Sequence, residues 1–210
     1  MVQYTTYECR EVTNEDLKRI DAIVTVVNQA YTESEGISIC KENKFILIRG
    51  YIYIQILNIV LCTDGWTTPK HIYGEPRTNP KEIEDLIVRN GTTHAFYLAL
   101  DGDLIVGTVL HEKPNDKGEA YISLLSVVPN YQSKGVGGQL FRFLLNDMKK
   151  KGIPTASLST FASRLEVLSW YKKLGFVEEP ERVDFGWHYR DSEIKPDCDA
   201  ELIIMKKPLV

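Results

Sequence analysis

The first apolar pattern along the chain has the period of a helix. After Thr13, apolar residues recur at alternating steps of three and four, at Leu17, Ile20, Val24, Val27 and Tyr31. This spacing predicts one face of an amphipathic helix. Thr13 and Asp16 have the spacing of a capping box in which Asp replaces Glu. A second helix is predicted in TNPKEIEDLIVRNG, because Asn79 can cap it, Pro80 suits its first position and Gly91 can end it.

From residue 94 onward the pattern changes to that of strands. HAFYLAL and LIVGTVLHE read as two strands joined by an Asp-Gly turn, and EAYISLLSVV as a third. A glycine-rich turn then leads into a helix whose Val136, Leu140, Leu144 and Met148 recur at steps of four. Three lysines at 149–151 close this helix and Gly152 ends it. The strand TASLST, the helix RLEVLSWYKKLG and two short strands at FVEE and AELIIMKK follow. This order predicts a mixed α/β fold, with antiparallel strands first and strand–helix crossovers later.

Composition narrows the classes of protein that fit this pattern. A chain of 210 residues suits one sizeable domain or at most two small ones. The net charge of −4 argues against broad nucleic-acid binding, which needs a clustered positive surface. The four cysteines lack the spacing of a zinc site or a redox CxxC pair, and the N-terminus lacks the pattern of a secretory signal. We therefore expect a cytoplasmic setting, with the nucleus also compatible.

One segment has an unusual composition. Residues 45–62, FILIRGYIYIQILNIVLC, are nearly continuously apolar and reach the length of a membrane helix. Arg49, Gln55 and Asn58 interrupt the run, and its β-branched and tyrosine content favours strand or buried irregular structure. We therefore expect no membrane span.

The glycine-rich turn QSKGVGG follows an apolar run that stops at Pro129. A dinucleotide fingerprint would need glycine where Leu140 stands, and the lysine and hydroxyl residue of a P-loop are absent. The pattern Q-x-x-G-x-G, with Gln132, Gly135 and Gly137, directly follows V-x-P. It resembles the coenzyme A signature (Q/R)xxGx(G/A) of the GNAT superfamily of N-acetyltransferases. Glycines in such a turn can also be purely structural.

A second motif supports this resemblance. SWYKKLGFVEE places Tyr171 four residues before Gly175-Phe176, as in that family, and the strands and helices come in the family's order. The resemblance covers most of the chain outside residues 36–64. It implies a single N-acetyltransferase domain over 1–210, with an atypical apolar insert at 36–64. The implied fold is a central mixed β-sheet flanked by helices, with its fourth and fifth strands splayed apart.

The resemblance also implies the cofactor and the residues that hold it. Acetyl-CoA is the expected co-substrate, with the backbone of Val127 at its pantetheine or thioester carbonyl. Successive backbone N–H groups at the start of a helix suit a pyrophosphate. This cradle comprises Gln132, Ser133, Lys134, Gly135, Val136, Gly137 and Gly138. No metal is expected, because His71, His94 and His188 show no ligand spacing.

The implied chemistry is direct attack of an amine on the thioester. Tyr171 is the candidate general acid for the departing thiolate, although it can also be read as a core aromatic. At the family's usual position for a base, the fourth strand carries Tyr121 or Ser123, and neither is a strong base. Glu119 is the carboxylate candidate on that strand, with Glu112 and His111 as alternatives; exposed strand-end carboxylates are usually just solvated.

The acceptor is expected to be an amine of a small molecule or a peptide. Aromatic and hydroxyl side chains after the first helix suggest its pocket, namely Tyr31, Trp66, Thr67 and Thr68. Trp66 can equally anchor its loop. The insert at 36–64 is predicted to cover the acceptor side or to widen a homodimer interface. Alternatively, it is non-coding sequence that the gene model includes in the protein. Two further function hypotheses stay open: a non-catalytic acyl-CoA sensor, and an interaction protein that docks through the insert.

Overall fold

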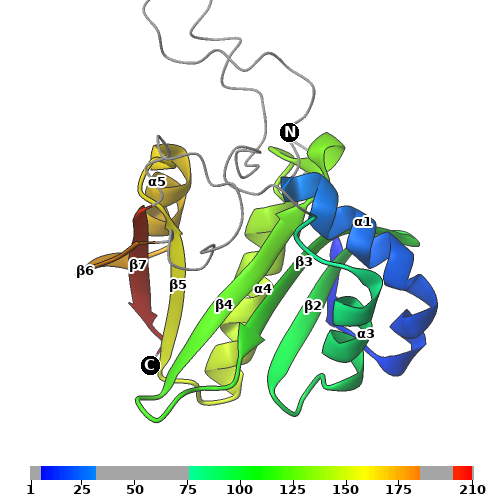
Figure 1. Ribbon diagram of the computed structural model, residues 1–210, viewed down its shortest axis with the longest axis horizontal. Helices are drawn as coiled ribbons and strands as arrows, with labels where there is room; N and C mark the ends of the chain where they lie inside the picture. The colour runs from blue at the N-terminus through cyan, green and yellow to red at the C-terminus, as the bar shows by residue number, and fades with distance from the viewer. Residues whose placement is uncertain (1–5, 32–75, 185–200, 210) are drawn as a thin grey trace, which may run out of the picture.

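The fold is a mixed sheet with helices on both faces. The computed structural model describes residues 6–31, 76–184 and 201–209. In this part of the chain, seven strands form one sheet in the order β1-β2-β3-β4-β5-β7-β6 (Figure 1). Neighbouring strands are antiparallel except β4 and β5, which are parallel. The predicted mixed α/β class is confirmed.

The elements begin and end close to the predicted positions. The strands are Glu8–Glu11 (β1), His94–Asp101 (β2), Leu104–Glu112 (β3), Glu119–Val127 (β4), Thr155–Phe161 (β5), Val177–Asp184 (β6) and Glu201–Pro208 (β7). The α-helices are Ile20–Tyr31 (α1), Pro80–Val88 (α3), Val136–Lys150 (α4) and Leu165–Lys173 (α5). In the described residues, two 3₁₀ helices span Asn14–Arg19 (η1) and Pro129–Tyr131 (η2).

The N-terminal segment is tied to the sheet through Asp16. The Thr13 N–H donates to the Asp16 carboxylate at 2.9 Å, which confirms the predicted capping box, although the segment it caps is η1 and α1 begins six residues later. Arg10 also donates two hydrogen bonds of 2.8 Å to the same carboxylate. Arg10 lies in β1, a four-residue edge strand that the sequence pattern did not reveal. Such a short strand has too few positions for a periodic signal.

The second helix follows the prediction closely. The Asn79 side chain accepts a hydrogen bond of 3.0 Å from the Glu82 N–H, and Pro80 occupies the first helical position. Gly91, with φ of +78°, lies in the turn that follows α3. The capping and breaking signals in TNPKEIEDLIVRNG were therefore sufficient to place this helix.

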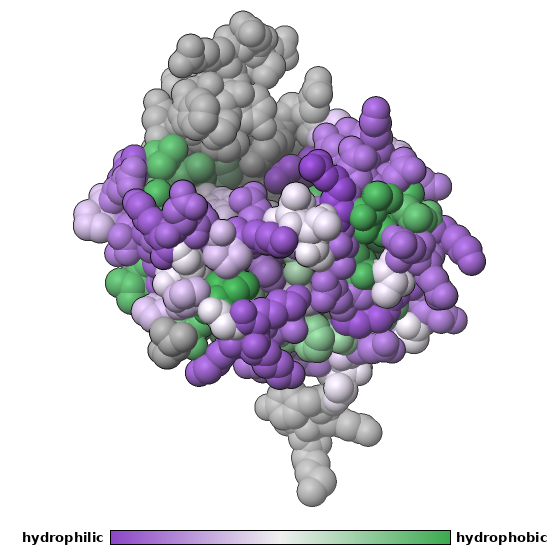
Figure 2. All heavy atoms as spheres, turned by 90° about the horizontal axis from the view of Figure 1, so that it is seen from below, coloured by the Kyte–Doolittle hydropathy of each residue, from purple (hydrophilic) through white to green (hydrophobic). Residues whose placement is uncertain are grey.

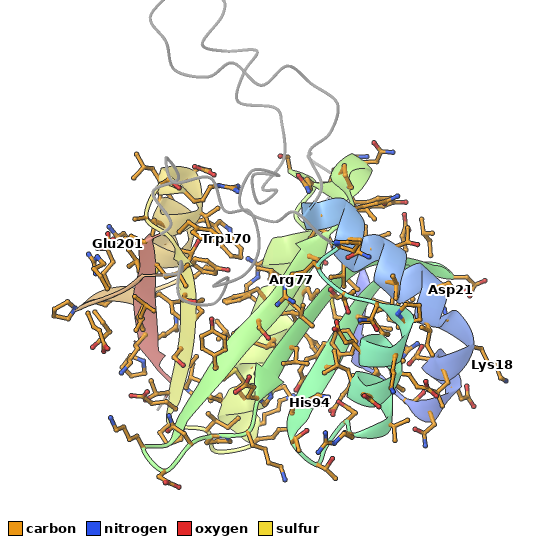
Figure 3. All side chains as sticks on the ribbon, in the orientation of Figure 1. Lys18, Asp21, Arg77, His94, Trp170 and Glu201 are labelled. Atoms are coloured by element: carbon orange, nitrogen blue, oxygen red, sulfur yellow. The ribbon has the colours of Figure 1, made fainter. Side chains whose placement is uncertain are left out.

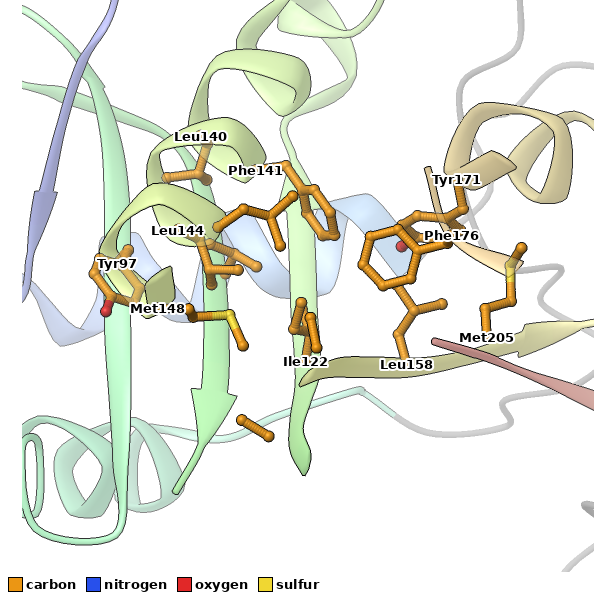
Figure 4. Packing of buried hydrophobic residues seen from close by; sticks show 14 of the residues in the cluster. Tyr97, Ile122, Leu140, Phe141, Leu144, Met148, Leu158, Tyr171, Phe176 and Met205 are labelled. Carbon is orange, nitrogen blue, oxygen red and sulfur yellow. The ribbon is translucent and has the colours of Figure 1, made fainter. Parts of the chain in front are cut away.

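Two apolar cores hold the helices against the sheet. On one face α1 and α3 contribute Ile23, Val27 and Ile83 to a core with β2 and β3. On the other face α4 contributes Phe141, whose ring lies 5.6 Å from that of Tyr171 and 5.9 Å from that of Phe176 (Figure 4). The packing on this second face therefore links α4 to α5 and to Phe176, which follows α5.

A glycine in β3 sets how closely α4 approaches the sheet. A Cβ atom at Gly107 would lie 3.1 Å from the Ser126 carbonyl oxygen and 3.3 Å from a methyl group of Val136, the first residue of α4. Both distances are tighter than an ordinary van der Waals contact. Gly107 thus allows the N-terminus of α4 to lie directly over β3 and the end of β4.

β4 and β5 pair only at their beginnings and then separate. Their register covers only Glu119–Tyr121 against Thr155–Ser157. Farther along, β4 contains an extra residue relative to β3, and Leu124 there has a φ of +51°. A bulge of this kind bends its strand. The splay between the fourth and fifth strands that the family resemblance implied is therefore present.

The hydropathy of the helices and of the surface bears on the question of a membrane span. Within the described residues, no helix combines the length and the hydropathy that a membrane crossing requires. Figure 2 shows the lower face of the view in Figure 1, where hydrophilic residues predominate and apolar residues lie in separate groups. The apolar stretch at 45–62 lies outside the described residues.

The Asp16 contacts predict a specific pH dependence of stability. Burial disfavours the Asp16 carboxylate, but hydrogen bonds from Arg10 and Thr13 outweigh this, and the net result is a lowered pKa. A lowered folded-state pKa stabilises the fold above the unfolded value of about 3.9, and this contribution is lost as pH falls through the folded-state value. We expect Asp16→Asn to lower the free energy of unfolding by about 2 kcal/mol at pH 7, measured by urea denaturation.

The same comparison should be repeated at low pH. The difference between wild type and Asp16→Asn should shrink as the pH falls below about 4. Asp21→Asn is the matched control, because Asp21 is exposed, and it should change stability by less than about 0.5 kcal/mol. An undiminished difference at pH 2 would show that the Asp16 charge is not the stabilising feature.

The close approach of α4 predicts a second stability effect. Gly107→Val should lower the free energy of unfolding by about 1 to 3 kcal/mol, because the new side chain overlaps Ser126 and Val136. Leu104→Ala is the control in the same strand, since Leu104 is 54% exposed, and should stay within about 0.5 kcal/mol of wild type. Equal stability of Gly107→Val and wild type would contradict the proposed packing.

Candidate active site

A cavity of about 1030 Å³ lies where β4 and β5 separate. Its walls come from β4, β5, the first turns of α4, the helix α5, and the strands β6 and β7. Trp170 from α5 and Arg77 from the segment before α3 both line it, and Figure 3 labels them. The splay in the sheet therefore opens into a space large enough for a substantial ligand.

Val127 presents its backbone to this gap. The Val128 N–H donates to the Val106 carbonyl at 3.1 Å, and the neighbouring pair in the antiparallel register is Val127 with Gly107. Since bonded and non-bonded pairs alternate in an antiparallel ladder, the N–H and C=O of Val127 point away from β3. The Gln132 side chain donates to the Val127 carbonyl at 3.0 Å. The sequence-predicted Val127 and Gln132 are thus brought together, and the Val127 N–H faces the cavity.

The glycine-rich turn contains two residues in the left-handed conformation. Ser133 and Gly135 have φ values of +59° and +88°, and Gly135 is the N-cap of α4. Alternation between left-handed and other conformations turns successive N–H groups toward one point, which suits an anion. The cavity lining includes Gln132, Ser133, Gly135, Gly137 and Gly138. Val136 is buried and can contribute only its backbone.

Two cations near the turn have different placements. The Lys134 ammonium lies 5.3 Å from the centre of the Tyr131 ring, and Lys134 is not among the described residues that line the cavity. Arg142 does line it, and its Nη1 would lie 3.3 Å from a Cβ atom at Gly138. The guanidinium thus folds back over the first turn of α4. Sequence reasoning missed Arg142, although its spacing four residues after Gly138 places both on one helix face.

Tyr171 reaches the cavity from α5. Its side chain is 8% exposed, lines the cavity and packs against the rings of Phe141 and Phe176. Tyr171 is therefore a core aromatic residue, as one interpretation held. It also lies at the cavity wall, which the interpretation as a general acid requires. The Phe176 N–H donates to the Tyr171 carbonyl at 3.0 Å, and Gly175 between them has a φ of +86°. The Gly-Phe motif thus closes the C-terminus of α5 beneath Tyr171.

Tyr121 and Ser123 both line the cavity from β4. The Tyr121 hydroxyl lies 2.6 Å from the hydroxyl of Ser159 on β5. This hydrogen bond spans the gap just beyond the last paired residues of the two strands. Sequence reasoning did not identify Ser159, because nothing in TASLST distinguishes it from the other hydroxyl residues there.

The carboxylate candidate for the base has a partner. Glu119 lines the cavity and accepts a hydrogen bond of 2.7 Å from Lys206. This hydrogen bond lowers the pKa of Glu119, which makes its carboxylate a weaker base. Of the alternatives, Glu112 lines the cavity, whereas His111 is buried beside Tyr97 and is not among the described lining residues. Burial also lowers the pKa of His111.

The acceptor candidates cannot be placed in the same way. Trp66, Thr67 and Thr68 lie outside the described residues, and so does the insert at 36–64. Tyr31 ends α1, but its side chain is outside the described part. Within the described residues, no three His, Cys, Asp or Glu side chains gather to hold a metal ion. His94 makes local hydrogen bonds to Thr93 and to the Leu86 carbonyl, as expected.

Comparison with known proteins decides the family. The acetyltransferase (GNAT) family matches residues 61–176, which is more than half of the 210-residue chain. This protein belongs to the GNAT acetyltransferase family. The family's glycine-rich turn, its tyrosine helix and its splayed strands are the three features that the site above combines.

Individual GNAT relatives match to different extents. The [ribosomal protein bS18]-alanine N-acetyltransferase of Escherichia coli K12 is 33% identical over 91 residues, which cover 43% of this chain and 57% of that relative. The match thus spans little more than half of the relative's length. The tRNA(Met) cytidine acetyltransferase TmcA 2 of Saccharolobus solfataricus is 24% identical over 97% of this chain, but over only 25% of its own length.

Solved structures confirm the GNAT fold. An N-acetyltransferase from Staphylococcus aureus Mu50 has a TM-score of 0.64 at 16% identity, covering 98% of this chain and 100% of that one. The ribosomal-protein-S18-alanine N-acetyltransferase of E. coli has a TM-score of 0.60 at 16% identity, covering 97% and 94%. The PaiA N-acetyltransferase of Thermoplasma acidophilum, solved with coenzyme A, has a TM-score of 0.56 at 19% identity, covering 97% and 99%.

Proposed function

We propose that this protein is an acetyl-CoA-dependent N-acetyltransferase that acetylates a primary amine, with residues 1–210 forming one catalytic domain. The observation that carries the proposal is the cavity itself. It joins an anion-binding turn at α4 to a free strand edge at Val127 and to the phenol of Tyr171. Acetyl-CoA has a diphosphate, an extended pantetheine arm and a thioester, and these match the three parts in that order.

The anion-binding turn fits the diphosphate. The left-handed conformations of Ser133 and Gly135 would direct backbone N–H groups at the start of α4 toward one anion, whereas the Gln132 N–H is bonded to the Pro129 carbonyl. Arg142 adds a positive charge beside Gly138. Glycine is required where a side chain would enter the space of the ligand, and Gly137 and Gly138 line the cavity at the first turn of α4. The residues present therefore suit a phosphate group.

The strand edge and the phenol suit the remaining parts. The Val127 N–H would donate to a carbonyl of the pantetheine arm or of the thioester, and a backbone donor there would stabilise the developing oxyanion. Tyr171 is the general acid that would protonate the departing thiolate. Glu119 was the predicted base, but its bond to Lys206 leaves it less suited to that role.

The acceptor is the less defined half of the reaction. Relatives include enzymes named for a ribosomal-protein alanine and for a tRNA cytidine. A small-molecule amine and an exposed amino group of a protein both stay open as acceptors. We place this protein among the amine acetyltransferases, with acceptor residues on the wall of the cavity opposite α5.

The role of Tyr171 can be tested by removing one hydroxyl. Tyr171→Phe keeps the ring against Phe141 and Phe176, and should lower kcat on the order of 100-fold while leaving the Kd for coenzyme A unchanged. The measurements are thiol release from acetyl-CoA with a panel of amines, and calorimetric titration with coenzyme A. Tyr97→Phe is the control, because it removes a buried phenol hydroxyl outside the cavity lining.

The same assay separates the proposal from its main alternative. Tight coenzyme A binding without turnover of any amine, and without an effect of Tyr171→Phe on basal hydrolysis, would favour a non-catalytic acyl-CoA sensor. Failure of the wild-type protein to bind coenzyme A at all would contradict both functions.

Arg142 is expected to strengthen cofactor binding. Arg142→Gln should raise the Kd for coenzyme A about tenfold, because it removes a charge-assisted contact to phosphate. The gap between variant and wild type should narrow at high salt, since screening weakens the charge. Arg182→Gln is the matched control, because Arg182 pairs with Glu178 on β6 and lies outside the lining. Equal Kd values for Arg142→Gln and wild type would exclude this role.

A further inference from the structure

The hydroxyl pair of Tyr121 and Ser159 occupies a distinctive place in the cavity. Tyr121 ends the short paired stretch of β4 opposite Ser157, and Ser159 lies two residues farther along β5. Side chains two residues apart in a strand share a face, so Tyr121 and Ser159 lie on the same side of the sheet. Their hydroxyls meet at 2.6 Å across the gap, and Tyr121 is 38% exposed.

Tyr171 lies on the opposite side of the sheet. It belongs to the core under α4, together with Ala156 and Leu158, whose side chains alternate with those of Ser157 and Ser159 along β5. The cavity is therefore bounded by the hydroxyl pair on one face and by Tyr171 on the other. A thioester in the gap would have a proton donor on one side and the hydroxyl pair on the side from which an amine can approach.

The chemistry of two hydroxyls limits what they can do for an amine. One proton joins the two oxygens, which leaves a second proton to donate and several lone pairs to accept. Such a pair can accept an N–H from an amine and hold it in place, but neutral hydroxyl oxygens are poor bases. An ammonium group has no lone pair with which to attack. The amine must therefore arrive uncharged, or lose its proton to water before it reacts.

Charged groups also line this cavity, and their titration must be distinguished from that of the acceptor amine. Glu119 and Lys206 form a salt bridge at 2.7 Å. The remaining titratable side chains on β3, β4 and β6 and their connections are Glu112, Lys113, Lys117 and Glu181. Arg77, Arg142 and Arg164 complete the charged lining. When two acceptors with different amine pKa values are compared on the same enzyme, the titration of the enzyme's own groups stays the same. A difference between the two pH profiles therefore comes from the amine.

We propose that the hydroxyls of Tyr121 and Ser159 form the subsite for the acceptor amine, and that the acceptor is an α-amino group, such as a peptide N-terminus. This rests on the proposed acetyltransferase function. α-Amino groups have pKa values of about 7.7 to 8.0, and lysine side chains have values of about 10.4. At pH 7.5 the uncharged fraction of an α-amine is therefore on the order of 200-fold larger than that of lysine.

The reaction balances with the groups present. The uncharged amine nitrogen, held by Tyr121 and Ser159, attacks the thioester carbon, so that a C–N bond forms and the C–S bond breaks. The proton that the nitrogen releases passes to water beside the hydroxyl pair. The departing sulfur takes a proton from Tyr171, which regains one from solvent. The products are the N-acetylated amine and free coenzyme A.

The experiment compares two short peptides with the full-length chain. One has a free N-terminus and no lysine, and the other has the same composition with a blocked N-terminus and one lysine. Thiol release from acetyl-CoA is followed from pH 6 to pH 10. We expect kcat/KM to rise with an apparent pKa near 8 for the first peptide and near 10 for the second. At pH 7.5 the first should react on the order of 200-fold faster.

Two variants test the subsite from both strands. Tyr121→Phe and Ser159→Ala should each raise the KM for the free-N-terminus peptide about tenfold, with an unchanged Kd for coenzyme A. The double variant should add little to either single change, because both remove the same hydrogen bond. Tyr97→Phe again serves as the control. Thermal melting checks that each variant is folded. If one variant is not, the other still removes the hydrogen bond between Tyr121 and Ser159.

The outcomes separate this inference from the proposed function. The same apparent pKa for both peptides would show that an enzyme group titrates, and faster turnover of the lysine peptide would exclude the α-amine class. Either result would overturn the inference, as would acceptor KM values unaffected by both substitutions, while amine acetylation itself still stood. A wild-type protein that binds coenzyme A but acetylates neither peptide nor any other amine would instead contradict the proposed function.

Discussion

The separation of β4 from β5 is the constraint on which the rest of the site depends. Parallel pairing over Glu119–Tyr121 fixes where the two strands begin together, and the extra residue at Leu124 bends β4 away from its partner. If pairing continued, the N–H of Val127 would serve β5 instead of facing a cavity. A continuous ladder would also close the space between Tyr121 and Ser159 on one face and Tyr171 on the other. The bulge thus opens a cavity in the sheet.

The packing on both faces keeps this gap open. The absence of a side chain at Gly107 allows α4 to lie close to β3. The ring of Phe141 in α4 packs against those of Tyr171 and Phe176. The start of α4 and the tyrosine of α5 are therefore positioned by the same aromatic contacts. This coupling gives a physical reason why the glycine-rich turn and the Tyr-x-x-x-Gly-Phe motif occur together, since each supplies one wall of the same cavity.

Charge is used differently in the two halves of the molecule. In the N-terminal half, Asp16 is buried and tied to Arg10 and Thr13, so its charge holds β1 to the helix that follows. Around the cavity, the Glu119–Lys206 pair is more exposed, and Arg142 has no carboxylate within ion-pairing distance in the described part of the chain. The first arrangement stabilises the fold, and the second leaves a cation available for an anionic ligand.

The sequence by itself determined the features that are local in the chain. The glycine-rich turn from Gln132 to Gly138 and the register of Tyr171 with Phe176 each lie within a few residues, so their geometry follows from backbone conformation and helix spacing. Only the tertiary structure decided which distant residues meet. Arg10 reaches Asp16 through a strand too short to show a period, and Tyr121 meets Ser159, 38 residues farther along, across a gap that a bulge creates. Such contacts depend on strand order and bending, which no local pattern encodes.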